Sequence, residues 1–144
     1  MKTGQLKGAG AMGMRVTLRP EERIIINGAV VRNGGRTTTI VIDGEAQVLR
    51  ERMVMHPETA AKSPSRHAYY LCMLAYIEPA REAEHKQAFV TWMAEIMDAF
   101  QSPQVKLLCV DALLAVGRRE YFRALQLLRQ VIEYEDQVLA EQAA

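Results

Sequence analysis

The apolar pattern of this chain changes its period near Met53. Before that point, short runs rich in β-branched residues are separated by turn signals, and after it apolar residues recur every three or four positions. Strands followed by helices are typical of an α+β fold. We therefore expect a small N-terminal antiparallel β meander of about four strands, followed by a C-terminal bundle of about four helices.

The predicted strands are short and lie close together, over residues 16–18, 24–31, 37–42 and 46–49. Asn27-Gly28 could close a type I′ hairpin or mark a bulge inside one long strand. Asn33-Gly34-Gly35 is the stronger hairpin signal, and Asp43-Gly44 is another. Such a meander is too small to bury both of its faces. One face should pack on the helices or on a second copy of the chain, so a homodimer is possible.

Four helices are predicted over residues 63–77, 80–100, 103–116 and 118–140. Ser63 or Ser65 could cap the first, and Pro79 suits the start of the second. Ser102-Pro103 should begin the third, and Gly117 should end it. Acidic residues over 133–141 oppose the dipole of the last helix. Its end should therefore fray or be held by a basic neighbour.

The order along the chain suggests how it is organised. Residues 1–13 are Gly/Ala-rich and patternless, and are interpreted as a disordered expression scar. Residues 14–56 form the β half and 57–144 the helical half, and 14–144 are expected to fold as one cooperative domain. No apolar run approaches the roughly 18 residues of a membrane span, and no secretory leader precedes Met14. We expect a cytoplasmic protein with no membrane contact.

The residues that usually carry catalysis or bind metals are not suitably spaced. His56, His67 and His85 lack metal-site spacing, and Cys72 and Cys109 lie inside apolar helical patterns as core thiols would. The pairs Glu21-Glu22 and Glu82–Glu84 are interpreted as solvated runs, with Glu22 as the anionic neighbour of Arg23. There is no phosphate-binding glycine loop. We predict no catalytic residue, no metal site, no cofactor and no enzymatic activity.

Arginine is concentrated in the β half. Residues 14–56 hold seven arginines, no lysine and five acids, or 7 − 5 = +2, whereas residues 57–144 hold 9 − 12 = −3. Guanidinium groups suit bidentate recognition of phosphate and of base edges. Strand alternation should place Arg15, Thr17 and Arg19 on one face, and a hairpin tip should gather others. The predicted RNA-binding residues are Arg15, Thr17, Arg19, Arg23, Arg32, Asn33, Arg36 and Arg50.

Three segments carry a family resemblance. The run from Met14 to Gly34, the segment Val48-Leu49-Arg50-Glu51 and the run from Ala68 to Pro79 resemble the FlbT family of flagellin-synthesis repressors. The likeness extends from Met14 to about Arg129. Its most specific part is Leu18-x-Pro-x-Glu-Arg23 leading into Asn27-Gly28-Ala-Val30.

The resemblance implies a bacterial post-transcriptional regulator. Such a protein associates with the untranslated leader of flagellin mRNA and promotes its degradation or blocks its translation, often beside FlaF, a second small regulator. No catalytic activity is implied. The alternative is a protein-interaction adaptor that binds flagellin or FlaF and affects RNA only indirectly.

Two short segments also resemble the carbon storage regulator family, namely Arg15–Arg19 and Val48–Glu51. Proteins of that family interlace β-strands in a dimer and read GGA in mRNA leaders. This second resemblance implies that Arg50 contacts base or phosphate, with Arg15, Thr17 and Arg19 beside it.

Overall fold

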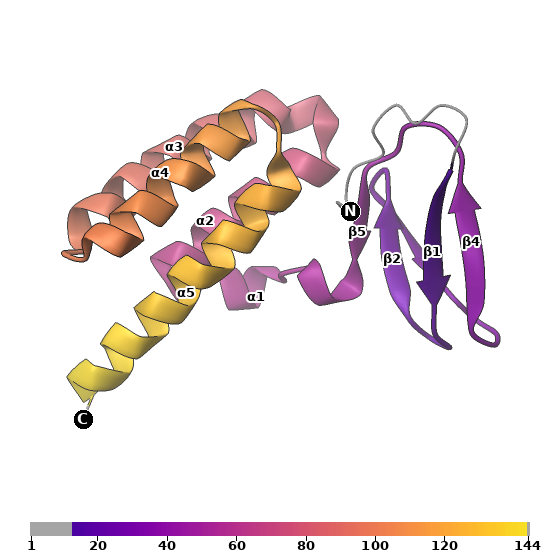
Figure 1. Ribbon diagram of the computed structural model, residues 1–144, viewed down its shortest axis with the longest axis horizontal. Helices are drawn as coiled ribbons and strands as arrows, with labels where there is room; N and C mark the ends of the chain where they lie inside the picture. The colour runs from indigo at the N-terminus through magenta and orange to yellow at the C-terminus, as the bar shows by residue number, and fades with distance from the viewer. Residues whose placement is uncertain (1–12, 144) are drawn as a thin grey trace. The chain divides into compact units, whose positions relative to one another are not determined.

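The computed structural model describes residues 13–143 and shows an α+β fold, as predicted. The chain divides into two compact units, residues 1–54 and 55–144. We call the described part of the first the β unit and that of the second the helical unit (Figure 1). The interpretation of residues 1–13 as an expression scar lies outside the described residues, except for Gly13.

The β unit holds five strands in two antiparallel sheets. The strands are β1 Met14–Leu18, β2 Arg23–Ile26, β3 Ala29–Arg32, β4 Thr38–Ile42 and β5 Val48–Arg50, followed by the 3-10 turn η1 Glu51–Met53. One sheet pairs β1 with β4, and the other has the order β3-β2-β5. The prediction of about four antiparallel strands is close to the five present. The predicted meander order is wrong, because only β2 and β3 pair with a strand next to them in sequence.

The turn signals have different outcomes. Asn27 and Gly28 have φ values of 51° and 86°, as a type I′ turn requires, and they close the β2–β3 hairpin. This excludes the bulge. The segment Asn33-Gly34-Gly35 instead carries the chain from β3 to β4 in the other sheet, and Asp43-Gly44 carries it from β4 to β5. The predictions of hairpins at these two positions are wrong.

The two sheets share one apolar cluster. In β1 the residues alternate strictly between buried and exposed, so Met14, Val16 and Leu18 point inward. Buried Ile24 and Val48 of the other sheet join them, with partly buried residues of β2, β4 and the segment before β5 packed around. The inward faces of the two sheets therefore pack on each other in this cluster.

The helical unit follows the predicted limits closely. Its elements are α1 Pro57–Ala60, α2 Pro64–Ile77, the 3-10 turn η2 Pro79–Arg81, α3 Glu82–Ala99, α4 Pro103–Gly117 and α5 Tyr121–Ala143. Ser63 Oγ accepts a hydrogen bond from Arg66 N at 3.3 Å, and Ser102 Oγ accepts one from Val105 N at 3.4 Å. Both capping predictions are confirmed. The short α1, which lies outside the four predicted helices, makes five helices in place of about four.

The four long helices pack as a bundle. Helix α2 contacts α3 and α5, and α4 contacts α5 and α3 (Figure 1). Cys72 and Cys109 are free thiols with no exposed surface, as predicted. The other fully buried side chains of this core include Tyr69, Phe89, Met93, Val105, Leu125, Leu128 and Val131. Within residues 13–143, no helix is both long and apolar enough to cross a membrane.

The acidic end of α5 is held by a basic neighbour, one of the two predicted possibilities. Arg66, in the first turn of α2, forms ion pairs with both Glu135 and Asp136. Glu135 Oε2 also accepts a hydrogen bond from Ser65 N at 3.1 Å. A carboxylate at this helix N-terminus is favourable because the amide groups there are unpaired donors.

The connection from α4 to α5 places a positive φ on an arginine. Gly117 ends α4 as predicted, but Arg119 is the residue with φ 62°. Glu120 N donates to Ala115 O at 2.8 Å and Arg119 N to Val116 O at 3.0 Å, the two bonds of a Schellman motif.

Burial raises the pKa of Glu82, but the Tyr121 hydroxyl that donates to it and the charge of Arg119 lower that pKa overall.

Candidate nucleic-acid interface

The turn that joins β1 to β2 sets the geometry of the arginines. Glu22 N donates to Arg19 O at 3.1 Å, which closes a four-residue turn with Pro20 in its second position. Glu21 occupies the third position with φ 67°, where a type II turn favours glycine. Such a conformation costs about 1 kcal/mol or more in a residue with a side chain. The bond from Glu21 N to Asn33 O, at 2.7 Å, helps to hold it.

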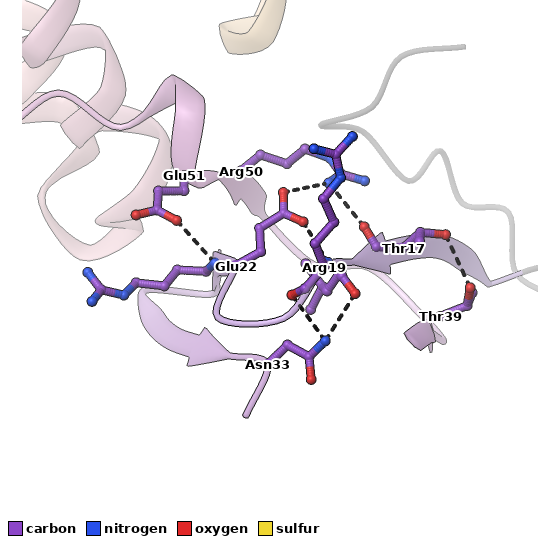
Figure 2. Close-up of polar contacts among 9 residues, drawn as sticks. Thr17, Arg19, Glu22, Asn33, Thr39, Arg50 and Glu51 are labelled. Atoms are coloured by element: carbon purple, nitrogen blue, oxygen red, sulfur yellow. Dashed lines mark hydrogen bonds and ion pairs between the residues drawn. The ribbon is translucent and has the colours of Figure 1, made fainter. Parts of the chain in front are cut away.

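Glu22 connects the two sheets near the C-terminal end of β1. Its Oε1 accepts from Arg19 N at 2.9 Å, and its Oε2 accepts from Arg50 Nη1 at 3.3 Å (Figure 2). Arg50 Nη1 also donates to Thr17 O at 3.3 Å. The side chains of Arg50 and Glu22 are only 28% and 27% exposed. The Arg50 guanidinium is therefore held against the protein, although one edge still reaches solvent.

The side-chain amide of Asn33 is likewise bonded to other groups of the protein. Its Nδ2 lies within hydrogen-bonding distance of the carbonyl oxygens of Leu18, Arg19 and Arg36, at 3.0, 3.1 and 2.8 Å. Its Oδ1 accepts from Gly35 N at 3.0 Å. Figure 2 shows this amide below the turn, directed at its carbonyl groups. The hydrogen-bonding capacity of this side chain is thus used to join the β3–β4 connection to the β1–β2 turn.

Two arginines face each other across the β2–β3 hairpin. Arg23 and Arg32 are direct cross-strand partners, an arrangement that repels unless a counter-charge is near. Arg32 Nη1 lies 2.7 Å from Glu21 Oε1, in an exposed ion pair. The Arg23 backbone N–H donates to Glu51 Oε1 at 3.2 Å, and the Arg23 side chain is left exposed.

The remaining predicted residues lie on exposed positions. Arg15 and Thr17 share the outer face of β1, as strand alternation predicted, and Thr17 Oγ1 lies 3.1 Å from Thr39 Oγ1. Four guanidinium groups of the β unit form no ion pair and no side-chain hydrogen bond within residues 13–143. These four, which we call the open arginines, are Arg15, Arg19, Arg23 and Arg36.

The structure brings some of the eight predicted residues together and leaves others apart. Arg50 donates both to Thr17 O and to Glu22, which also accepts from Arg19 N. Asn33 is linked to Arg19 and Arg36 through their carbonyl groups. Arg32, Asn33 and Arg36 do not lie at a hairpin tip as predicted, because β3 and β4 belong to different sheets.

Sequence reasoning missed the acids that organise this surface. The prediction of a solvated run holds for Glu21, which is 70% exposed although it pairs with Arg32. It is wrong for Glu22, which is 27% exposed and pairs with Arg50. The expected neighbour of Glu22, Arg23, is not its partner. The signal that could have revealed the turn is Pro20, because proline favours the second position of a type II turn. Among the described residues, no group of three His, Cys, Asp or Glu side chains is placed to hold a metal ion.

Comparisons with known proteins agree with the resemblance in the sequence. The chain matches the family described as flagellar protein FlbT over residues 14–139. It is 37% identical over 128 residues to the flagellum biosynthesis repressor protein FlbT of Caulobacter vibrioides, covering 89% of this chain and 90% of that protein. It is 31% identical over 134 residues to a probable flagellum biosynthesis repressor protein, FlbT 1, of Bradyrhizobium diazoefficiens, covering 92% and 89%. No solved structure matches it. The chain therefore belongs to the FlbT family of flagellar proteins.

Proposed function

We propose that this protein is a cytoplasmic, non-enzymatic repressor of flagellin synthesis that acts after transcription. Its β unit binds the untranslated leader of flagellin mRNA, and binding promotes degradation of the message or blocks its translation. Relatives named as flagellum biosynthesis repressors support the regulatory part of this proposal. The RNA-binding part rests on the chemistry of the β unit.

The observation that carries the proposal is the set of open arginines. Four exposed guanidinium groups without an acidic partner lie in one small unit that contains no lysine. A guanidinium presents parallel N–H donors to a phosphate and a planar face to an unstacked base. Because residues 13–54 contain no Phe, Tyr or Trp, base stacking would have to use these guanidinium planes.

The first test measures binding of a labelled flagellin leader RNA across a salt series. Arg23→Gln and Arg36→Gln should each weaken binding about fivefold and should reduce the dependence of log affinity on log salt by about 0.7 per lost phosphate contact. The matched control is Arg123→Gln, which removes an exposed arginine from the helical unit. The control should bind like the wild type.

A second variant should strengthen binding. Glu22→Gln keeps an acceptor for Arg19 N but removes the negative charge beside Arg50. The Arg50 guanidinium could then turn toward a phosphate, and affinity should rise by about two- to fivefold at low salt. If Glu22→Gln and both open-arginine variants bind like the wild type, the β unit is not the RNA surface.

One observation favours the alternative function, an adaptor for flagellin or FlaF. Val138 and Leu139 follow buried Glu135 at helical spacing, but they are 39% and 51% exposed. The apolar stripe of α5 therefore continues where no described residue covers it. Purified flagellin or FlaF should bind the wild type but not Leu139→Ser, with little salt dependence. Such binding, together with no RNA binding at any salt concentration, would replace the RNA proposal.

A further inference from the structure

Helix α4 is apolar on nearly all of its surface, although only one face is buried. Val105, Cys109, Ala112 and Val116 lie on the face buried in the helical unit. On the opposite face, Leu107, Val110 and Leu114 are 62%, 38% and 51% exposed. We call these three residues the α4 stripe. A helix that is apolar all round is normally covered on both sides.

The α4 stripe has the spacing of a coiled-coil seam. Leu107 to Val110 is three residues and Val110 to Leu114 is four, so Leu107, Val110 and Leu114 occupy successive a, d and a positions of a heptad. Lys106 then falls at a g position and Asp111 at the following e position. These two positions flank the seam on opposite sides.

The flanking charges are available for a partner. Lys106 is exposed and Asp111 partly exposed, and within residues 13–143 neither forms an ion pair. They are also too far apart around their own helix to pair with each other, because five residues turn a helix by well over a full turn. In a parallel, in-register coiled coil, a g residue faces the e residue five positions further along the partner helix.

We propose that the α4 stripe binds the α4 stripe of a second copy of this chain, in parallel and in register, to form a twofold symmetric dimer. Leu107, Val110 and Leu114 each meet their own counterpart across the axis. Lys106 of each copy pairs with Asp111 of the other, so the same surface supplies both halves of each ion pair. An antiparallel pairing centred on Val110 would instead bring the two Asp111 carboxylates together.

The test begins with the mass of the full chain in solution, measured by sedimentation equilibrium from low to several hundred micromolar protein. The wild type should show a monomer–dimer equilibrium in the micromolar range, because a seam of little more than one heptad forms a small interface. Leu107→Ser and Leu114→Ser should each raise the dissociation constant by more than about tenfold. Val90→Ser on α3, at a residue 52% exposed, is the matched control and should leave it unchanged.

Charge reversal then tests the register and direction. Lys106→Glu should raise the dissociation constant about tenfold, and adding Asp111→Lys in the same chain should restore the wild-type value. Asp111→Asn should weaken a parallel dimer but tighten an antiparallel one. All these positions are on the surface, so each variant should fold. Circular dichroism checks that it does.

Three results would overturn the inference. One is a wild type that stays monomeric at every concentration. The second is a dimer that Leu107→Ser and Leu114→Ser leave intact, because another surface would then hold it. The third is a dimer that Asp111→Asn tightens, because the helices would then run in opposite directions.

Discussion

The guanidinium of Arg66 and the carboxylate of Asp136 form two parallel hydrogen bonds, of 2.9 and 2.8 Å, between residues 70 positions apart. The same guanidinium lies 3.7 Å from Glu135, whose side chain is only 10% exposed. Arg66→Met should therefore lower the free energy of unfolding by about 2 kcal/mol, because a nearly buried carboxylate loses its counter-charge. Urea unfolding measures this. Arg81→Met, which breaks the fully exposed pair with Glu84, should leave the stability almost unchanged, because water screens such a pair.

The same pair should make stability depend on acid pH. The hydrogen bond from Arg66 holds the pKa of Asp136 below its ordinary value of 3.8. A carboxyl group with a lowered folded pKa stabilises the fold above its unfolded pKa, and that contribution is lost as the pH falls through the folded pKa. Wild type should exceed Asp136→Asn in stability near neutral pH by less than about 1 kcal/mol, since Asp136 is half exposed. The difference should shrink as the pH falls below 3.8. A constant difference would contradict this.

At Arg119 the backbone and the side chain impose opposing demands. Its φ of 62° favours glycine, but its Nε and Nη2 bind the Glu82 carboxylate at 2.9 and 3.0 Å. Arg119→Ala loses the ion pair and keeps the strain, whereas Arg119→Gly loses the ion pair and relieves the strain. The glycine variant should therefore be the more stable of the two by about 1 kcal/mol, as measured by thermal unfolding. Equal stability would show that the backbone is not strained.

Both thiols should be unreactive in the folded protein. Burial raises the pKa of Cys109 to about 11 and raises that of Cys72 still further. The thiolate is the reactive form, and neither sulfur reaches solvent. Labelling with Ellman's reagent at mildly alkaline pH should be at least about a thousandfold slower than in urea, because it requires unfolding. Rapid labelling of one thiol without denaturant would show that the bundle opens locally.

Asn33 should prove to be a structural residue. Asn33→Ala removes the amide that bonds Leu18 O, Arg19 O and Arg36 O. Leaving these carbonyl groups without their donor should lower the free energy of unfolding by about 2 kcal/mol. Thr37→Ala, at an exposed residue of the same connection, should change it by less than about 0.5 kcal/mol. If Asn33→Ala is as stable as this control, the Asn33 amide of the wild type is not needed for folding and is free to bind a ligand.

Local chemistry explains which parts of the fold could be predicted. The starts of α2 and α4 follow from Ser63 and Ser102, whose hydroxyl groups cap amides three residues ahead. At Asn27-Gly28 the sequence indicated residues that tolerate positive φ, which allowed the hairpin but did not exclude a bulge. Strand order could not be predicted in this way. Asn33-Gly34-Gly35 indicates a change of direction but not which strand the next one joins, and that choice depends on the shared apolar cluster.

The candidate site shows the same limit. Alternation in β1 correctly placed Arg15 and Thr17 on the outer face, because it depends only on neighbours in sequence. The ion pair between Glu22 and Arg50 joins residues 28 positions apart. No local pattern distinguishes such a bound arginine from an open one. The composition of the surface could be predicted, whereas the arginines available to a ligand could not.

The pairing of β1 with β4 also sets an order of events for the newly made chain. The β2–β3 hairpin can form as soon as residue 32 is available, since its two strands are joined by two residues. The first strand must wait for residues 38–42, and the central strand β2 gains its second neighbour only with β5. Until then, the inward face of β1 lacks the contact of Val48 and is only partly covered, so it is more exposed to other chains. Synthesis past Arg50 is therefore the step that closes the β unit and protects it from aggregation.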